Sequence, residues 1–338
     1  MLELYGGNIM SLLEVKDLRM YFPVGKKGFF SREKQFIYAV DGISFSLEKG
    51  ETLGLVGESG CGKSTVVRAL ARLYTPTSGD VFLNGKNLSA LNKRELLEAR
   101  RTMQIVFQNP YASLNPRETV GDIIAEPLRI YKRRGLLTLS EEQIQSRVDK
   151  LMDMVGLLTY YKNRYPHEFS GGQRQRIGIA RSLALSPQLV LADEPVSALD
   201  VSIQAQILNL FKDIQKEMGL SYLFIAHDLA VIEYISDRIA VMYLGKIVEI
   251  SDFRDLYENP LHPYTKALLS SAPIPDPQIE ATRKRIILSG DVPSPNIRQP
   301  GCYFYARCSY RLEKCKNHEP SLQGSPTHKT ACFLCEQS

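Results

Sequence analysis

One nine-residue segment, GESGCGKST at residues 57–65, combines glycines, a lysine and hydroxyl side chains at a spacing that could bind phosphate. Glycine has no Cβ, so the backbone can curl and point several N–H groups toward an anion. The helix expected from Ser64 adds the partial positive charge of its N-terminus. Lys63 supplies a charge for the outer phosphates, and Ser64 an oxygen for Mg²⁺. The segment predicts a nucleoside triphosphate site formed by Gly57, Glu58, Ser59, Gly60, Cys61, Gly62, Lys63, Ser64 and Thr65.

An ordinary strand–turn–helix connection, with glycines that only tighten the turn, is the structural alternative for residues 57–65. At average amino-acid frequencies, a chance match to this spacing has a probability of about 0.01. The apolar residues before the loop and the helix-forming residues after it are the context that a phosphate loop needs. We therefore favour the phosphate site, although the loop alone leaves both ATP and GTP open.

Composition places the chain among soluble globular proteins of two or three domains, with 338 residues, 44% hydrophobic and 23% charged. The net charge of +5 is too small to indicate a nucleic-acid partner, and the basic run at 132–134 reads as a solvated face. No segment approaches the ~18 consecutive apolar residues of a membrane span. The N-terminus lacks the features of a signal peptide. We expect the chain to stay inside the cell and to reach a membrane only by docking on a partner.

The remaining segments predict an α/β core that would hold the loop. Residues 12–56 alternate apolar and polar side chains in short runs, which is typical of strands joined by turns. Charged, helix-forming segments dominate residues 109–185, and apolar, strand-like segments return after them. Strands that alternate with helices favour a mainly parallel sheet. Two hairpins are expected, one turning at Asn84–Gly85 and one at Gly245.

The composition of the chain changes after about residue 255. Prolines crowd the next forty or so residues, and few periodic segments survive, so we expect a separate extension at 256–338 that consists mostly of loops. Five of the six cysteines lie in the last 37 residues. In a reducing compartment, such a group favours a metal or cluster site over a disulfide framework.

Residues 170–200, SGGQRQRIGIARSLALSPQLVLADEPVSALD, resemble the ATP-binding cassette (ABC) family closely. Together with the phosphate loop, six motifs occur in the order that this family shows. The resemblance covers residues 12–255 and implies a RecA-like parallel-sheet core, an antiparallel β subdomain and a helical subdomain inserted at about 109–185. The residues that carry it are the signature Ser170, Gly171, Gly172 and Gln173, the Walker B Asp193 with Glu194, the D-loop Ser197 to Asp200, the switch His227 and the Q-loop Gln108.

The resemblance assigns chemistry to side chains that follow predicted strands. Asp193 ends an apolar strand, where a carboxylate costs desolvation unless it serves a cation, so we expect it to hold Mg²⁺ through water. Ser64 and Gln108 are the further Mg²⁺ contacts that the family implies. The catalytic set is Gln108, Glu194 as general base toward the attacking water, and His227 at the γ-phosphate. The structural alternatives are a helix-capping Asp193, a Glu194 salt bridge and a structural His227.

The signature segment predicts a second anion site. Ser170 opens a helix with two glycines in its first turn, and an exposed helix N-terminus favours negative charge. One chain does not need two such sites for one triphosphate. The resemblance implies a head-to-tail dimer in which ATP lies between the phosphate loop of one subunit and the signature of the other.

An aromatic side chain upstream of the phosphate loop should stack on the adenine. Phe22, Tyr21 and Tyr38 are the candidates, because the basic loop after YFPV leaves the register open. Each of these side chains could equally be a core residue.

Residues 258–277 resemble a segment peculiar to oligopeptide and dipeptide importers of the ABC family, with HPYT at 262–265 as the most telling part. The phosphate loop, FQNPYASLNPR and the loop after YFPV are more similar to the F-type than to the D-type ATPase subunit of these importers. The implied partners are a D-type ATPase chain (a heterodimer, or a homodimer in isolation), two membrane permease subunits and, indirectly, an extracellular solute-binding protein.

The spacing Cys302-x₅-Cys308-x₆-Cys315-x₁₆-Cys332 resembles the ligand set of a [4Fe–4S] cluster in this subfamily. Four thiolates are what such a cluster needs, and tetrahedral Zn²⁺ would accept the same ligands. Free buried thiols are the structural alternative. Cys335 is the spare thiol of the group.

The expected function is ATP hydrolysis that powers import of di- or oligopeptides, with the chain bound peripherally at the cytoplasmic face of the cell membrane. Other solutes stay open, namely oligosaccharides, nickel complexes and glutathione, because the cargo never touches this chain. A soluble ABC ATPase of translation or DNA repair is the second class, but the chain has one cassette and no long coiled-coil insertion. A regulatory module with a degenerate nucleotide site is the third, and the intact Lys63, Asp193, Glu194 and His227 argue against it.

Overall fold

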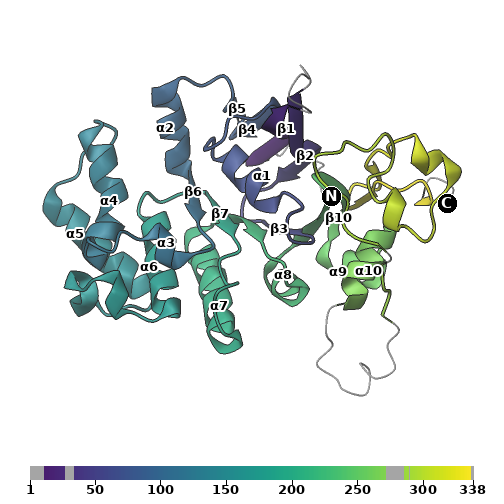
Figure 1. Cartoon of the computed structure of the whole chain (residues 1–338). Helices are drawn as coiled ribbons and strands as arrows, with labels where there is room; N and C mark the ends of the chain where they lie inside the picture. Colours follow the sequence, from purple (N-terminus) through teal and green to yellow (C-terminus); the bar gives the residue numbers. More distant parts are fainter. Residues whose placement is uncertain (1–10, 27–33, 272–284, 289, 336–338) are drawn as a thin grey trace, which may run out of the picture.

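The computed structural model describes residues 11–26, 34–271, 285–288 and 290–335, which form two β-sheets with helices packed around the larger one (Figure 1). The strands are β1 (Leu13–Lys26), β2 (Lys34–Leu47), β3 (Thr52–Val56), β4 (Ser78–Leu83), β5 (Lys86–Asn87), β6 (Met103–Val106), β7 (Leu189–Asp193), β8 (Ser221–Ile225), β9 (Arg238–Tyr243), β10 (Lys246–Asp252), β11 (Gln323–Gly324) and β12 (His328–Thr330). The smaller sheet is antiparallel with the order β2-β1-β4-β5, and the larger has the order β11-β12-β10-β9-β3-β8-β7-β6.

The centre of the larger sheet is parallel. Strand β3 pairs in parallel with β8 and β9, β8 pairs with β7, and β7 pairs with β6. Every residue of β3, β7 and β8 is buried, which is typical of parallel strands that are covered on both faces. The expected α/β fold with a mainly parallel core is therefore confirmed.

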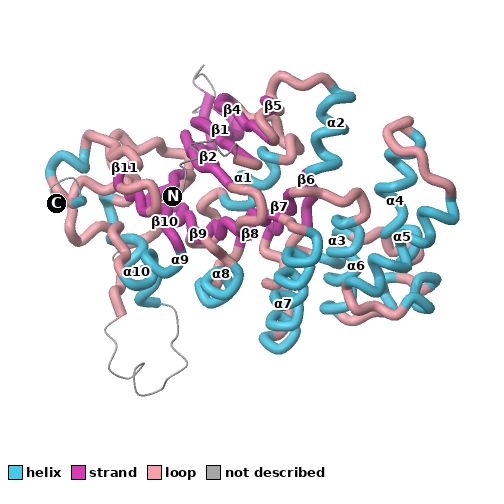
Figure 2. The backbone as a smooth tube through the Cα atoms, turned by 180° about the vertical axis from the view of Figure 1, so that it is seen from behind, coloured by secondary structure: helices cyan, strands magenta, loops and turns pink. Residues whose placement is uncertain are grey.

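The helices divide into those that cover this sheet and those that extend beyond its β6 edge. The α-helices are α1 (Lys63–Leu70), α2 (Lys93–Thr102), α3 (Pro110–Ser113), α4 (Val120–Arg133), α5 (Glu141–Met154), α6 (Gly171–Leu183), α7 (Val201–Met218), α8 (Leu229–Ile235), α9 (Phe253–Glu258) and α10 (Pro263–Ser271). The 3₁₀ turns are η1 (Thr159–Asn163), η2 (Pro166–Glu168), η3 (Tyr305–Arg307) and η4 (Glu313–Lys316). Helices α3 to α6 gather at one end of the molecule, as the helix-forming composition of that segment predicts (Figure 2).

Local sequence signals explain where several elements begin and turn. Capping boxes start α5 at Ser140 and α6 at Ser170, each completed by a glutamine three residues later. Asn84 and Gly85 both have positive φ in the β4–β5 hairpin, and Gly245 turns the β9–β10 hairpin with φ 80°. Both predicted hairpins are therefore confirmed.

The C-terminal extension adds two short strands to the edge of the core sheet, while most of its described residues from 285 onward lie outside helices and strands. Strand β12 pairs antiparallel with β10, and β11 pairs with β12. Tyr264 and Phe304 of the extension are fully buried against Tyr243 at the end of β9, with ring centroids 4.7 and 5.2 Å from it. Residues 272–284 of the extension, which include part of the importer-like segment, lie outside the described residues, as do residues 27–33 of the loop after YFPV.

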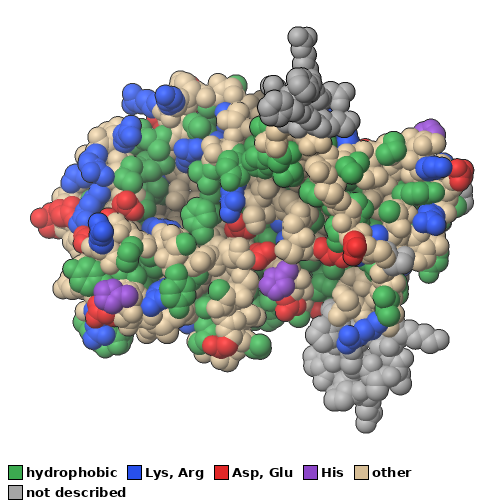
Figure 3. Space-filling view, in the orientation of Figure 1, with side chains coloured by type: hydrophobic (Ala, Val, Ile, Leu, Met, Phe, Trp, Pro, Cys, Tyr) green, Lys and Arg blue, Asp and Glu red, His purple; other side chains and the backbone are tan. Residues whose placement is uncertain are grey.

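Basic side chains gather over α2 and α4 on one face of the molecule (Figure 3). Lys132 and Arg133 lie in the last turn of α4, where cations interact favourably with the helix dipole. The basic run at 132–134 is therefore explained by its position at the C-terminal end of α4, where it stabilises the helix. None of the helices in the described part of the chain is long and apolar enough to span a membrane. The exposed basic residues of these two elements and the turn after α4 are Lys93, Arg94, Arg101, Lys132, Arg133 and Arg134.

We expect Ile207→Ala to lower the free energy of unfolding by about 2–5 kcal/mol, because the Ile207 side chain on α7 is 0% exposed and its loss leaves a cavity. Ile287→Ala is the matched control, since Ile287 is 89% exposed and should change stability by less than about 0.5 kcal/mol. Denaturant titration of the full chain measures both variants. Equal shifts of the unfolding midpoint would contradict the described packing of α7.

Candidate active site

The phosphate loop connects β3 to α1, and its glycines are required by backbone that passes close by. A Cβ on Gly62 would lie 2.0 Å from the carbonyl oxygen of Ala39, and one on Gly57 would lie 2.1 Å from the carbonyl oxygen of Met242. Gly62 has φ 108°, a conformation that side-chain-bearing residues rarely adopt. The backbone of β2 and β9 therefore packs directly against the curled loop and leaves no room for side chains at these two glycines. Helix α1 begins directly after the loop at Lys63.

The Lys63 side chain crosses the loop and is only 4% exposed. Its Nζ donates hydrogen bonds to the carbonyl oxygens of Gly57 at 2.7 Å and of Glu58 at 3.0 Å. Both partners are uncharged carbonyl groups, so neither of them neutralises the positive charge that would attract a phosphate group. Cys61 lies beside it, with Sγ 3.8 Å from Nζ, and burial raises the pKa of this thiol.

Asp193 and Ser64 come together as the sequence predicted for a Mg²⁺ site. The Ser64 hydroxyl donates to Oδ1 of Asp193 at 2.7 Å, and Asp193 is 2% exposed at the end of β7. Burial raises the pKa of the Asp193 carboxyl, and the bond from Ser64 opposes that shift. A bound cation would favour the charged carboxylate in this buried position, and hydroxyl and carboxylate oxygens are the donors that Mg²⁺ prefers. The residues therefore fit Mg²⁺.

Three further predicted residues meet at the carboxyl ends of β6, β7 and β8. The Gln108 side chain follows β6 and donates from Nε2 to Oε2 of Glu194 at 2.7 Å. His227 follows β8, and its Nδ1 lies 3.8 Å from the same oxygen. Glu194 has φ 48°, an uncommon conformation for a residue with a side chain, which turns the chain sharply after β7. The arrangement surrounds one carboxylate with an amide and an imidazole beside the Asp193–Ser64 pair.

The signature residues Ser170 to Gln173 begin α6, away from the phosphate loop. Helices α6 and α1 lie apart in both views of the chain (Figures 1 and 2). The Ser170 hydroxyl accepts the N–H of Gln173, and the Gln173 side chain accepts the N–H of Ser170. A Cβ on Gly172 would lie 2.5 Å from Cγ2 of Ile203, so α6 packs closely on α7 here.

Of the three aromatic candidates for adenine stacking, two share one face of the small sheet. Tyr21 pairs with Tyr38 across β1 and β2, with ring centroids 4.9 Å apart, whereas Phe22 packs on Tyr74 at 5.3 Å. The Tyr21 hydroxyl is occupied by the fully buried carboxylate of Asp41. Adjacent strand residues point to opposite faces, so Tyr21 and Phe22 cannot serve the same ligand face.

Asp41 links the small sheet to the C-terminal extension. It accepts hydrogen bonds from the hydroxyls of Tyr21 and Tyr303, and its Oδ2 lies 3.2 Å from Nε of Arg298 and 3.6 Å from Nζ of Lys246. Burial alone would raise the pKa of Asp41, but these hydrogen bonds and charges lower it. The carboxylate is therefore held in its charged form at the junction.

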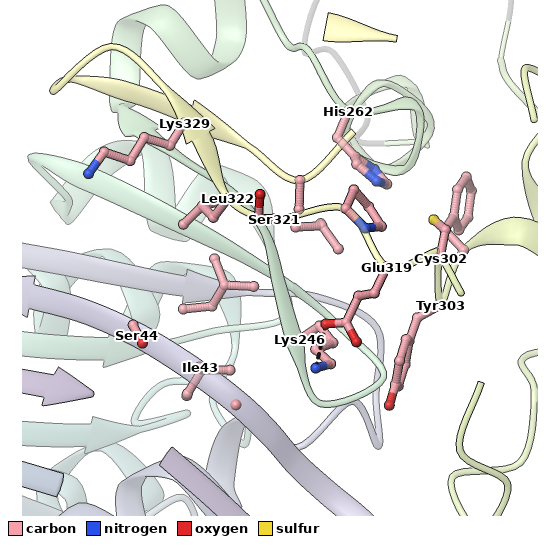
Figure 4. Close-up of a pocket in the computed structure, with 16 residues that line it drawn as sticks. Ile43, Ser44, Lys246, His262, Cys302, Tyr303, Glu319, Ser321, Leu322 and Lys329 are labelled. Atoms are coloured by element: carbon pink, nitrogen blue, oxygen red, sulfur yellow. Dashed lines mark ion pairs between the residues drawn. The ribbon is translucent and has the colours of Figure 1, made fainter. Parts of the chain in front are cut away.

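A cavity of about 460 Å³ lies between β2, β10 and the extension (Figure 4). The ion pair of Lys246 with Glu319, at 2.6 Å, lies in its wall. The lining residues in the described part of the chain include none of 57–65, so this cavity is separate from the phosphate loop.

The predicted cluster ligands Cys302, Cys308, Cys315 and Cys332 line one cavity of about 20 Å³. That space holds about one water molecule, far less than a four-iron cluster needs. Burial raises the pKa of the Cys302 thiol to about 12 and that of Cys332 to about 11. Among the residues that the structure covers, no group of three or more His, Cys, Asp or Glu side chains is placed to hold a metal ion.

The predicted [4Fe–4S] cluster and its zinc alternative therefore have no support in the structure. The structure instead leaves the four side chains as free thiols around a small space, with Cys315 buried and Cys302, Cys308 and Cys332 partly buried, and Cys335 is partly buried as well. Stoichiometric iron and sulfide in anaerobically purified protein would contradict this description.

Sequence reasoning missed two contacts made by the extension on the phosphate loop. The Tyr264 hydroxyl accepts the N–H of Glu58 at 2.9 Å, and Arg307 forms an ion pair with the Glu58 carboxylate at 2.8 Å. The HPYT segment at 262–265 could have indicated the Tyr264 contact, because the sequence analysis singled it out but gave its residues no structural role. Nothing in the local sequence around Arg307 marked it.

A phosphate loop, a buried carboxylate for a cation and a glutamate with an amide and an imidazole, all on one parallel sheet, define an ATP-binding cassette. Residues 40–197 match the ABC transporter family, and residues 248–315 match the oligopeptide/dipeptide transporter C-terminal region. The dimeric structure of MJ0796, a bacterial ABC transporter cassette, has a TM-score of 0.62 and 30% identity, over 72% of this chain and 99% of that one.

Two curated relatives match along most of the chain. The oligopeptide transport ATP-binding protein OppF of Salmonella typhimurium is 53% identical over 324 residues, 95% of this chain and 96% of that protein. The dipeptide transport ATP-binding protein DppF of Escherichia coli is 50% identical over 326 residues, 96% of this chain and 95% of that protein. The chain belongs to the family of ABC transporter ATPases formed by these oligopeptide and dipeptide transport ATP-binding proteins.

We expect Gly62→Ala to abolish nucleotide binding, because the added Cβ meets the Ala39 carbonyl and the φ of 108° disfavours alanine. Gly178→Ala is the matched control: Gly178 lies inside α6 with open space around its Cβ position, and alanine should stabilise that helix by about 0.5–1 kcal/mol. Equilibrium ATP binding by the two variants and the parent chain measures the difference. Unchanged binding by Gly62→Ala would contradict the described loop.

Proposed function

We propose that this chain hydrolyses ATP to power the uptake of di- or oligopeptides through a membrane transporter. The observation that carries the proposal is the meeting of Gln108, Glu194 and His227 beside the Asp193–Ser64 pair at one edge of the sheet. The C-terminal region and the two transport ATP-binding relatives support peptides as the cargo. Import of another solute by the same machinery is the alternative.

In this proposal, each residue acts on a bound triphosphate. The N-terminus of α1 and Lys63 bind the phosphates, with the loop backbone curled around them. Ser64, Asp193 and Gln108 would hold Mg²⁺, which neutralises charge on the phosphate oxygens. The Glu194 carboxylate takes a proton from the attacking water, and Gln108 at 2.7 Å orients that carboxylate. His227 donates a hydrogen bond to the γ-phosphate.

We propose further that ATP is bound between two ATPase chains, with the signature Ser170 to Gln173 of one facing the phosphate loop of the other. The separation of α6 from α1 supports this, because the helix N-terminus with its two glycines is then available to a second molecule (Figure 1). A cassette of the same fold is described as dimeric. The proposed partner is a D-type ATPase chain, and a homodimer would form in its absence.

The proposed assembly places this pair under two permease subunits at the cytoplasmic face of the membrane, fed by an extracellular solute-binding protein. The support is that its relatives are named as the ATP-binding proteins of transport systems. Their cargo names differ between oligopeptide and dipeptide, so the ligand of the solute-binding protein identifies the cargo.

We expect Glu194→Gln to reduce ATP turnover by about 10²–10⁴-fold while ATP still binds, because the amide cannot accept the proton of water. Glu98→Gln, the same change at an exposed position of α2, should leave turnover unchanged. Phosphate release by the assembled transporter and ATP binding by the full chain are the measurements. Normal turnover by Glu194→Gln would overturn its role as the base.

We expect Ser170→Arg to abolish ATP-dependent association of the two ATPase chains while each chain still binds ATP through its own loop. Ser140→Arg is the matched control, because Ser140 caps α5 with the same capping box but carries no signature glycines. Nucleotide-dependent crosslinking of the pair measures association. Normal association by Ser170→Arg would contradict the proposed dimer geometry.

A further inference from the structure

We propose that the C-terminal extension holds the phosphate loop in its nucleotide-binding shape through Glu58, with Arg307 and Tyr264 as positioning residues. The inference rests on the proposed function, since it takes the loop to be the ATP site. It assigns to the extension a role in ATP affinity.

The Arg307 guanidinium donates two parallel hydrogen bonds to the Glu58 carboxylate. Nη1 lies 2.8 Å from Oε2, and Nη2 lies 3.2 Å from Oε1. The Arg307 side chain is 9% exposed and that of Glu58 is 29% exposed, so the pair is largely shielded from water. The hydrogen bond to Glu58 raises the pKa of Arg307. A planar guanidinium fits a carboxylate in this way and a lysine cannot, so the contact fixes direction as well as distance.

Tyr264 forms a hydrogen bond with the backbone of Glu58. Its hydroxyl accepts the Glu58 N–H at 2.9 Å, and the side chain is 0% exposed. Its ring packs against Tyr243 and Phe304, with centroids 4.7 and 5.5 Å away. The hydroxyl is therefore carried by a rigid aromatic cluster rather than by a mobile side chain.

A buried carboxylate on β10 fixes the segment that carries Tyr264. Glu249 is 0% exposed; its Oε1 accepts the N–H of Leu261 at 2.7 Å, and its Oε2 accepts that of His262 at 2.8 Å. Nε2 of His328 on β12 lies 2.7 Å from Oε1. Burial lowers the pKa of His262 to about 3, so its neutral Nδ1 accepts the Tyr264 N–H at 3.1 Å. Contacts thus run without a break from β12 to the phosphate loop.

The cysteine-rich turn fixes Arg307 in the same manner. Arg307 ends η3, between Cys302 and Cys308. The N–H of Cys302 donates to the carbonyl of Cys315 at 2.8 Å, and a Cβ on Gly301 would lie 2.3 Å from that oxygen. The turn is therefore closely packed. The N–H of Arg307 donates to the carbonyl oxygen of Phe304 at 3.0 Å, so the backbone that carries the guanidinium toward Glu58 is itself held in this turn.

Glu58 is the point at which these contacts reach the triphosphate site. Its carbonyl oxygen accepts a hydrogen bond from Nζ of Lys63 at 3.0 Å. The residue is therefore held at its carboxylate and N–H by the extension, and at its carbonyl by the lysine that serves the phosphates. Releasing Glu58 loosens the loop, while Glu194 and His227 keep their places after β7 and β8. The expected effect falls on ATP affinity and KM rather than on kcat.

The experiment is a double-mutant cycle on the full chain, with ATP binding measured at equilibrium. We expect Arg307→Gln and Glu58→Gln each to weaken ATP binding by about tenfold, and the double variant to be no weaker than either single variant. Arg307→Lys should weaken ATP binding less than Arg307→Gln does, because lysine keeps the positive charge but cannot make the two parallel hydrogen bonds of a guanidinium. Tyr264→Phe, which keeps the ring packing, should weaken binding a few-fold.

Arg311→Gln is the matched control, because Arg311 lies in the same extension and contacts the Tyr305 ring rather than the loop. It should bind ATP like the parent chain, and thermal unfolding of every variant identifies any loss of fold. In the assembled transporter, Arg307→Gln should raise KM for ATP and keep kcat within about twofold. Parent-like ATP affinity of both folded variants, Arg307→Gln and Tyr264→Phe, would overturn the inference, as would additive effects of Arg307→Gln and Glu58→Gln. Failure of the parent chain itself to bind ATP would instead overturn the proposed function.

Discussion

The parallel pairing of β3, β8, β7 and β6 is the constraint on which the site depends. Parallel neighbours end at the same edge of a sheet, so the residues that follow them meet there. One carboxylate oxygen, Oε2 of Glu194, lies within 3.8 Å of side-chain nitrogens of both Gln108 and His227. The three residues are distant in sequence. The phosphate loop follows β3 at the same edge. An antiparallel sheet would send these residues to opposite ends.

The C-terminal extension is an integral part of this nucleotide-binding core. Its β12 extends the central sheet, and the buried Asp41 joins it to the small sheet through Tyr303 and Arg298. Tyr264 and Arg307 reach the phosphate loop itself. Because buried polar groups are satisfied only when every partner is in place, these junctions tie the position of the extension to the shape of the loop.

The cysteine group shows where chain spacing loses its predictive value. Four thiols at intervals typical of a cluster do gather around one space, but that space is only about 20 Å³. Separation along the chain does not report how the sulfur atoms are arranged in space or how much room they enclose, because both depend on tertiary packing. The adenine-stacking residue stayed open for the same reason, since the hydroxyl of Tyr21 is occupied by Asp41, a partner that only the folded chain reveals.

Sequence by itself determined the features that arise from neighbouring residues. The glycine spacing of the phosphate loop, the hairpin turns at Asn84–Gly85 and Gly245, and the alternation of strands and helices all follow from local backbone preferences. Only the tertiary structure decided which partners hold Glu58. Tyr264 and Arg307 lie 206 and 249 residues away along the chain, and such contacts depend on how the sheet, α10 and η3 pack together rather than on any local preference.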